Sequence, residues 1–433
     1  MSILPLFSSL SAFDEYLWSY FAIPMILFFG IFLSFKFRFI QIRKFPVVVR
    51  TFYELAKSKD QGIGAHPIKV FFASIGGCIG IGNIVAVCTA VQIGGPGAVF
   101  WMWVAGLIGM IIKYSEIYLG IVHRIPNAQG GYDGGPMYYL KKVIKSPIIP
   151  VLFAVLLAIY GTEVYMFNVM THSIVENWHL NHYLVIAGLL LFIVYTSSGG
   201  IARVGKVSSL LIPFFLIIYC GMGGWILLAN FAKLPGLILL IFKSAFTGYA
   251  PIGGFAGSGI LLTMSQGIAR GCYSGDIGVG YASIVHAEAR NQDPKRQAQL
   301  SILGIFLDTF VVCTFTTLLI LVTGVWHQDV PASMMVQKAL EHSFCYMNFF
   351  MPLFLFLLGY SSLIAFFFVG LKCANYLHPK GKYVYYAYAM GSFVLFSFVP
   401  QTHALTLMSI IGAALLCINL FGIYRWRKEI EVF

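Results

Sequence analysis

The chain has 433 residues, of which 59% are hydrophobic and only 10% are charged, and this balance excludes a water-soluble globular protein, a disordered chain and a coiled coil. Its mean hydropathy of +0.84 indicates a protein that resides in a membrane. The 28 Lys and Arg residues exceed the 16 Asp and Glu residues, giving a net charge of +12. In such a chain this excess reports membrane topology, and we expect no nucleic-acid partner.

Apolar stretches close to the ~20 residues that cross a bilayer recur along the whole chain. They predict helices, because lipid offers no water to satisfy the backbone of an open strand. The first stretch precedes the first basic residue, Lys36, and we interpret it as a retained span and not a cleaved signal sequence. We therefore expect an all-α polytopic membrane protein with about eleven transmembrane helices, at residues 17–35, 70–92, 97–123, 148–170, 181–198, 208–230, 236–263, 299–325, 346–370, 383–400 and 403–424.

The basic residues test this count independently. If the N-terminus lies outside the cell, the loops expected in the cytoplasm contain every Lys and Arg except Lys113, Lys233, Lys243 and Lys338. Cytoplasmic loops of membrane proteins are enriched in Lys and Arg, and one missed span would reverse every later loop. We expect an outside N-terminus and a cytoplasmic C-terminus.

Two spans contain clusters of glycine. Residues 76–83 hold four glycines in the second span, and residues 248–259 hold a second cluster in the seventh. Small residues can serve close helix packing, but each glycine costs about 1 kcal/mol of helix propensity relative to Ala. The density of glycine favours helices that are broken within the membrane.

The two clusters are placed symmetrically. Helices two to six and seven to eleven form two sets of five, and each set begins with a glycine-rich helix of opposite direction. This order is typical of inverted repeats whose broken helices meet near the midplane. We expect residues 1–69 to form an extra helix and a basic cytoplasmic loop, residues 70–230 the first repeat, and residues 231–433 the second repeat with a basic tail.

A series of motifs carries a family resemblance that covers nearly everything after about residue 66. They are ASIGGCIGIGN (73–83), GGPGAVFWMW (94–103), KYSE (113–116), GGPMYY (134–139), GGIARVGK (199–206), AFT (245–247), GGFAG (253–257), GIARG (267–271) and DT (308–309). Each motif is weak alone, but the ordered series resembles the alanine or glycine:cation symporter family. The resemblance implies a sodium-coupled amino-acid transporter of the amino acid, polyamine and organocation superfamily, in a bacterial inner membrane and with no cofactor besides Na⁺ as the coupling ion.

The step at residues 80–83 also resembles the broken first core helix of neurotransmitter:sodium symporters. That resemblance implies a sodium site made by the carbonyls of Gly76 and Ile79 and the hydroxyls of Ser361 and Ser362. A hard cation such as Na⁺ prefers oxygen ligands of this kind.

The same step implies a substrate site at Ile81, Gly82 and Asn83. Amide groups released at a helix break, together with the positive end of a helix dipole, bind a carboxylate. Asn83 offers a side-chain oxygen, although a lone membrane Asn also serves as a bond between helices.

Motif position places further residues near the substrate, namely Met166, Phe246, Thr247, Phe255 and Phe366. The family pattern has a Gln where Met166 stands and a Trp where Phe366 stands. Its Ser-Asn-Glu-Ala-Gly stretch is altered at residues 274–278. These departures put alanine and glycine themselves in question as substrates.

Charged residues inside the spans need partners, because a charge at the centre of a bilayer costs at least ~2.5 kcal/mol. Glu163 could bind a substrate ammonium or a proton, or form a structural bond as a protonated carboxyl, and Asp308 has the same choice between function and structure. Lys113 and Glu116 lie one turn apart, and we expect them to pair.

The leading hypothesis is sodium-coupled symport of a small neutral amino acid by alternating access. Alternatives are proton coupling through Glu163, transport of another small solute, and a passive channel. An intramembrane enzyme would need an activated nucleophile or a metal cluster, and no ligand or nucleophile motif is present. The sequence does not indicate an oligomeric state.

Overall fold

The computed structural model describes residues 4–58, 64–127, 130–247, 256–290 and 293–433, and it is an all-α membrane protein as expected. Within these residues, seven helices are long and apolar enough to cross a membrane, and a bent pair makes an eighth. Two other expected spans form α11 (His182–Ser197) and α20 (Gly381–Phe396), which have 16 residues each. The exact count of eleven is therefore not established by length and composition.

The N-terminal part forms one long helix and a short basic arm. It consists of α1 (Leu4–Leu17), η1 (Trp18–Ala22), α2 (Ile23–Lys36), α3 (Ile40–Arg43) and α4 (Phe45–Ala56). The spanning part, Ser9–Lys36, begins earlier than the expected residue 17. It packs against α7, outside the two repeats.

The helices that the sequence assigned to the two repeats follow along the chain as two sets. The first is α5 (Pro67–Cys78) with η2 (Ile81–Asn83) and α6 (Val85–Gly94), then α7 (Ala98–Val122), α9 (Ile148–Tyr160) with α10 (Val164–Trp178), α11, and α12 (Gly200–Ala229). The second is α14 (Ala256–Ser274) with α15 (Tyr281–Ala287), α16 (Pro294–Ile305) with η4 (Phe306–Cys313) and α17 (Thr314–Val322), α19 (Met347–Leu377), α20, and α21 (Gln401–Trp426).

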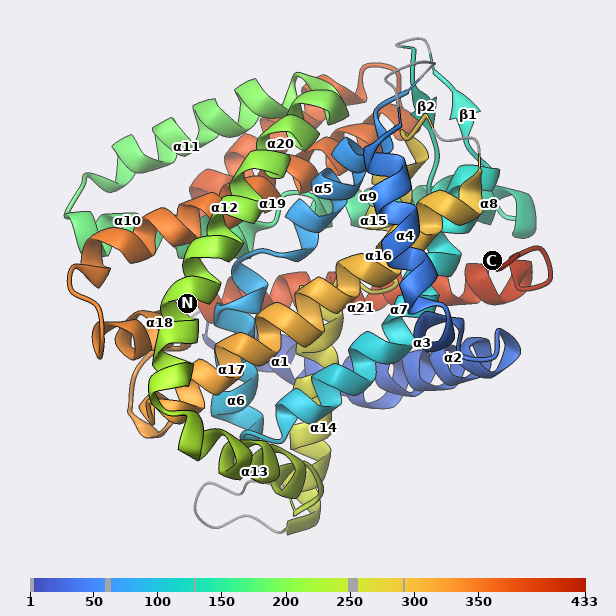
Figure 1. The fold of residues 1–433 in the computed structure, drawn as a ribbon. Helices are drawn as coiled ribbons and strands as arrows, with labels where there is room; N and C mark the ends of the chain where they lie inside the picture. The colour runs from blue at the N-terminus through green and yellow to red at the C-terminus, as the bar shows by residue number, and fades with distance from the viewer. Residues whose placement is uncertain (1–3, 59–63, 128–129, 248–255, 291–292) are drawn as a thin grey trace.

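Short elements connect these spans. A hairpin of β1 (Ile125–Pro126) and β2 (Tyr132–Asp133) precedes α8 (Pro136–Val143), while η3 (Phe231–Lys233) and α13 (Leu234–Thr247) join the two sets. In the second set, η5 (Val325–His327) and α18 (Ala332–Glu341) lie between α17 and α19, so each set has a short helix between its second and third spans. The hairpin, α4 and α8 lie at one end of the molecule, and α13 lies at the other (Figure 1).

The two broken helices lie side by side and antiparallel. Near one end, the Thr263 hydroxyl donates to the Gly94 carbonyl at 2.6 Å, and further along, the Tyr281 hydroxyl donates to the Ala73 carbonyl at 2.9 Å. Accordingly α6 packs against α14, and α5 packs against α15. The opposite directions agree with the inverted repeat.

The break expected at the second glycine cluster lies mostly outside the described residues, and the structure shows a further interruption that was not expected. Most of residues 248–259 fall outside the described residues, and Ala256 to Gly259 already belong to α14. The described interruption is residues 275–280, where Asp276, Gly278 and Gly280 all adopt positive φ angles. Because the helix runs on to Ser274, Arg270 lies within α14 and not in the loop that the topology assigned to it.

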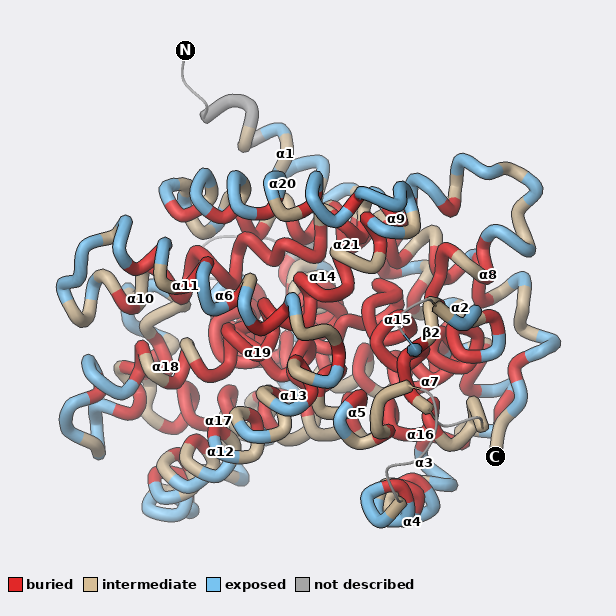
Figure 2. The backbone as a smooth tube through the Cα atoms, turned by 90° about the horizontal axis from the view of Figure 1, so that it is seen from above, coloured by how far each residue is buried: buried red, intermediate tan, exposed pale blue. Residues whose placement is uncertain are grey.

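Burial separates the inner helices from the outer ones (Figure 2). The middle of α19, both broken helices and α7 are buried, whereas α11, α12 and α20 expose many apolar side chains at the periphery. An exposed apolar periphery is what lipid requires of a membrane protein. The polar side chains at the two breaks, Asn83, Ser274 and Asp276, are buried within the protein.

Candidate functional site

The first break follows from the need for close approach. Helix α5 starts at Pro67 under the His66 cap and ends at Cys78, and the chain then bends by 51° into the η2 and α6 segment. A Cβ atom on Gly77 would collide with the Tyr281 hydroxyl, and one on Gly80 would collide with the Ser362 hydroxyl. Glycine is therefore required at both positions, which explains the cluster seen in the sequence.

The four residues of the expected sodium site gather at this break. The Ser362 hydroxyl lies 2.7 Å from the Gly76 carbonyl oxygen, and the Ser361 hydroxyl lies 3.5 Å from the same oxygen. Ile79 is fully buried directly after α5. In this conformation both hydroxyls donate to carbonyls, and a rotation of each would point an oxygen lone pair at a cation.

The expected anion site follows the sodium site along the chain and begins at Ile81, after Gly80. The backbone hydrogen bonds of the break run from Asn83 N to Gly80 O and from Ile84 N to Ile81 O. In the described part of the chain they leave the amides of Ile81 and Gly82 without a backbone acceptor. Both residues are buried, so these two amides are ready donors for an acidic group.

The Asn83 side chain forms hydrogen bonds that link the first break to η4. Its side-chain oxygen accepts from the Gly80 amide at 2.9 Å, and its side-chain nitrogen donates to the Asp308 carboxylate at 2.6 Å. Asp308 also accepts from the Ser274 hydroxyl at 3.2 Å and from Thr309 at 2.8 Å. These bonds occupy Asp308 structurally and join the first break to η4 and to the end of α14.

Glu163 lies at a third interruption, between α9 and α10. Its φ of 45° is left-handed, and its carboxylate accepts from the Tyr273 hydroxyl at 2.9 Å. The other carboxylate oxygen is buried and accepts no well-aligned hydrogen bond among the described residues, although the Tyr160 hydroxyl also interacts with Glu163. A Cβ on Gly82 would lie 3.6 Å from the Tyr273 ring, so Glu163 reaches the first break through one side chain.

Two further expected residues lie in the same inner region. A Cβ on Gly80 would lie 3.5 Å from the Met166 methyl group, which places Met166 beside the break. Phe366 is fully buried and stacks on Tyr281 with 4.2 Å between ring centroids. Met166 therefore borders the Gly80 step, whereas Phe366 lies against the second half of the other broken helix.

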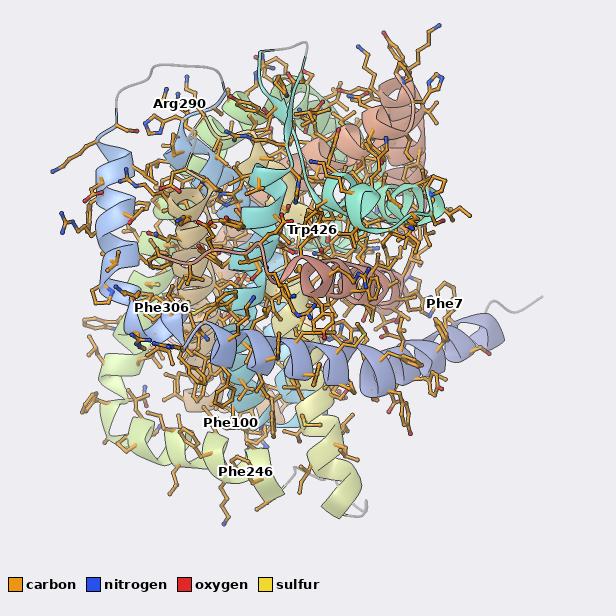
Figure 3. All side chains as sticks on the ribbon, turned by 90° about the vertical axis from the view of Figure 1, so that its right-hand side faces the viewer. Phe7, Phe100, Phe246, Arg290, Phe306 and Trp426 are labelled. Carbon is orange, nitrogen blue, oxygen red and sulfur yellow. The ribbon has the colours of Figure 1, made fainter. Side chains whose placement is uncertain are left out.

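The remaining expected residues are not brought to this region. The Phe246 side chain is 57% exposed and packs on Phe100, at the end of the molecule opposite Arg290 (Figure 3). Thr247 is exposed, and its hydroxyl donates to Lys243 within α13. Phe255 lies outside the described residues. The motif placed Phe246 and Thr247 near substrate because the seventh span was expected there, whereas the described break begins at residue 275.

Two contacts were missed by the sequence reasoning. Tyr273, which bonds to Glu163, lies two residues before the second break, and locating that break would have identified it. Lys113 and Glu116 do not pair: the Lys113 ammonium donates to Cys78 and Gly275, while Glu116 accepts from the Gly280 amide and from Asn419. Spacing along one helix cannot reveal partners on other helices.

Two antiparallel broken helices, crossed by a helix that offers hydroxyl groups to a carbonyl at the break, are the architecture of a membrane transporter. The chain belongs to the sodium:alanine symporter family, whose sequence pattern matches residues 5–431.

Known transporters are similar in sequence to this chain along most of its length. The sodium/alanine symporter AgcS of Methanococcus maripaludis is 29% identical over 426 residues, which cover 95% of this chain and 92% of that protein. An uncharacterized transporter of Haemophilus influenzae is 36% identical over 327 residues, covering 74% of this chain and 71% of that protein. The crystal structure of MhsT in complex with L-phenylalanine shares the fold, with a TM-score of 0.59 at 13% identity, covering 85% of this chain and 90% of that one. This chain is therefore a membrane transporter, not an enzyme, and its class is cation-coupled amino-acid transport.

Proposed function

We propose that this protein is a sodium-coupled symporter that carries a small neutral amino acid into the cell. The observation that carries the proposal is the convergence of Ser361 and Ser362 on the Gly76 carbonyl, beside the extended backbone of Gly80. A cation held there links α5 to α19, so its binding favours one arrangement of those two helices. The relative AgcS is named a sodium/alanine symporter, which supports this choice of ion and substrate class.

The substrate would lie between the first break and Glu163. Its carboxylate would accept from the amides of Ile81 and Gly82, and its ammonium would meet the free carboxylate oxygen of Glu163. Met166 lies beside Gly80, and the Asn83 side chain stabilises the backbone there by accepting a hydrogen bond from the Gly80 amide. A buried carboxylate with an open oxygen is a strong partner for an ammonium group.

Alternating access would then depend on contacts at the end of the bundle that bears the hairpin. Lys372 on α19 pairs with Asp133 at 2.7 Å and with Glu288, which follows α15. Arg124 donates to the carbonyls of Ala287 and Ala289 at the same place. These contacts join α19, the hairpin and the second broken helix, and release of solute on that side requires them to separate.

The distribution of basic residues supports the proposed orientation. Arg50, Lys142 and Arg290 lie on or beside α4, α8 and α15, all at the hairpin end (Figure 1). By the positive-inside rule we place that end in the cytoplasm, with the N-terminus outside, in the inner membrane.

A second candidate is proton coupling, and the open oxygen of Glu163 favours it, since a protonated carboxyl could replace one cation. Uptake of radiolabelled alanine, glycine and larger amino acids into proteoliposomes separates the candidates. Our proposal expects accumulation of alanine or glycine under an inward Na⁺ gradient and not under K⁺. Accumulation driven by a proton gradient alone would favour the second candidate, and equilibration without accumulation would indicate a channel.

A further inference from the structure

Lys113 lies in α7 at a point where that helix meets both broken helices. Its side chain is buried, with 2% of its surface exposed. The ammonium nitrogen lies 2.7 Å from the Cys78 sulfur and 2.6 Å from the Gly275 carbonyl oxygen. One positive charge therefore touches both broken helices at once.

Both contacts lie at the C-terminal end of a half-helix. Cys78 is the last residue of α5, and Gly275 directly follows Ser274, the last residue of α14. The last carbonyls of a helix lack partners within that helix, and the helix dipole gives this end a partial negative charge. Two such ends facing one another inside a membrane repel, and a cation between them stabilises both.

Two acidic residues, Glu116 and Asp276, lie near the Lys113 ammonium. Glu116 is committed to the Gly280 amide and to Asn419, so it is not the direct partner of Lys113. Asp276, in the second break, is buried, and one of its oxygens has no hydrogen-bond partner among the described residues. Asp276 and, more weakly, Glu116 interact electrostatically with Lys113. The ammonium thus lies among two helix ends and two carboxylates, which is the environment of a bound metal cation.

We propose that the Lys113 ammonium is a built-in cation, a fixed positive charge that holds the position between the two half-helices which a dissolved cation would otherwise have to fill. The inference rests on the proposed function, and it deepens it. It leaves a single exchangeable coupling ion, at Gly76, Ser361 and Ser362. Lys113 is a positioning residue in this account, because it sets the separation of the two breaks without touching the amino acid.

The test replaces the charge and asks whether sodium takes its place. Lys113→Met keeps most of the side-chain length and removes the ammonium. We measure the thermal unfolding of purified wild type and variant in detergent, in NaCl and in choline chloride of equal ionic strength. We expect NaCl to raise the Tm of the variant by at least about 4 °C more than it raises that of wild type, because Na⁺ binds the vacated position.

Uptake gives a second measurement. The dependence of alanine uptake on Na⁺ concentration should have a Hill coefficient of about 1 in wild type and of about 2 in Lys113→Met. Lys113→Arg keeps the charge and should retain the wild-type response to NaCl. Identical responses of wild type and Lys113→Met to NaCl would overturn the inference, because a purely structural side chain lowers stability equally in both salts.

A further variant decides the case in which Lys113→Met does not accumulate. Lys113→Met combined with Asp276→Asn removes the buried ammonium and its counter-charge together, so we expect it to accumulate and to lack the extra response to NaCl. Failure of this double variant to accumulate would contradict a role based on charge. If wild type shows no Na⁺-dependent uptake, the proposed function fails, whereas the comparison of Tm values still tests the built-in cation.

Discussion

The two breaks of this transporter occur in helices at equivalent positions of the two repeats, but different chemical groups line them. The first break presents the Gly76 carbonyl, two serine hydroxyls and the free amides of Ile81 and Gly82. Charged groups reach it through Asn83, which bonds to Asp308, and through Cys78, which bonds to Lys113. The second break contains the carboxylate of Asp276 and receives the ammonium of Lys113. A site made of neutral dipoles can exchange its ion, whereas a site filled by tethered charges holds one arrangement. In our proposal the two pseudo-symmetric breaks therefore have different roles, since the first binds the ion and the substrate and the second fixes the geometry.

The largest expected effect comes from adding one carbon at the first break. Gly80→Ala places a Cβ against the Ser362 hydroxyl and should lower Na⁺-dependent alanine uptake by about 100-fold, since roughly 3 kcal/mol of cation coordination is lost. Uptake into proteoliposomes measures it. The matched control is Gly391→Ala in α20, where an added Cβ meets nothing within 4 Å. Equal uptake by both variants would show that the Gly80 step does not shape a site.

Removing the charge of Glu163 comes next. Glu163→Gln keeps the size of the side chain and should lower uptake by about 10- to 100-fold, because an ammonium loses a charge-assisted bond worth roughly 1.5 to 3 kcal/mol. Expression should stay near normal. Tyr273→Phe removes the bond to the other oxygen and should have a smaller effect on uptake. Normal rate and pH profile in Glu163→Gln would instead make this residue a structural one.

The serine pair gives a graded effect within one site. Ser362→Ala should raise the Na⁺ concentration for half-maximal uptake about 10-fold, and Ser361→Ala only about 2- to 3-fold, since Ser361 lies further from the Gly76 carbonyl. Both variants should reach the membrane in normal amounts. An unchanged half-saturation in Ser362→Ala would remove this residue from the ion site.

The smallest effect is expected from removing a contact between the two broken helices. Tyr281→Phe deletes the hydrogen bond to the Ala73 carbonyl and should lower the free energy of unfolding by about 1 kcal/mol. Thermal unfolding in detergent reads this out as a Tm shift of a few degrees. The Na⁺ half-saturation should stay at the wild-type value, and a large change would mean that the second broken helix also shapes the ion site.

Much of this arrangement could be predicted from the sequence, for local reasons. The spans follow from hydropathy, and the first break from glycines that the neighbouring Ser362 and Tyr281 force to remain small. The interruption at residues 275–280 was not predicted, because the glycines of residues 248–259, most of which lie outside the described residues, gave the stronger local signal. The described break depends on Asp276 in a left-handed conformation, which composition does not reveal.

The partners of charged groups were beyond the reach of the sequence. Lys113 bonds to groups 35 and 162 residues away, so its pairing with Glu116 was the nearest choice along the helix and was wrong. Phe246 and Thr247 were placed near substrate by motif position alone, and in the structure both side chains are exposed. The resemblance to neurotransmitter:sodium symporters predicted that Gly76, Ile79, Ser361 and Ser362 lie together. It could do so because it concerned the geometry of the broken helix and not only the sequence motif.

The central claim is that one exchangeable cation binds at the first break. Equilibrium binding of ²²Na⁺ to the purified protein tests it most directly, with wild type compared with Ser361→Ala combined with Ser362→Ala. The account predicts one saturable site per protein in wild type and loss of that site in the double variant. Binding of ²²Na⁺ by the double variant with the affinity of wild type would contradict it.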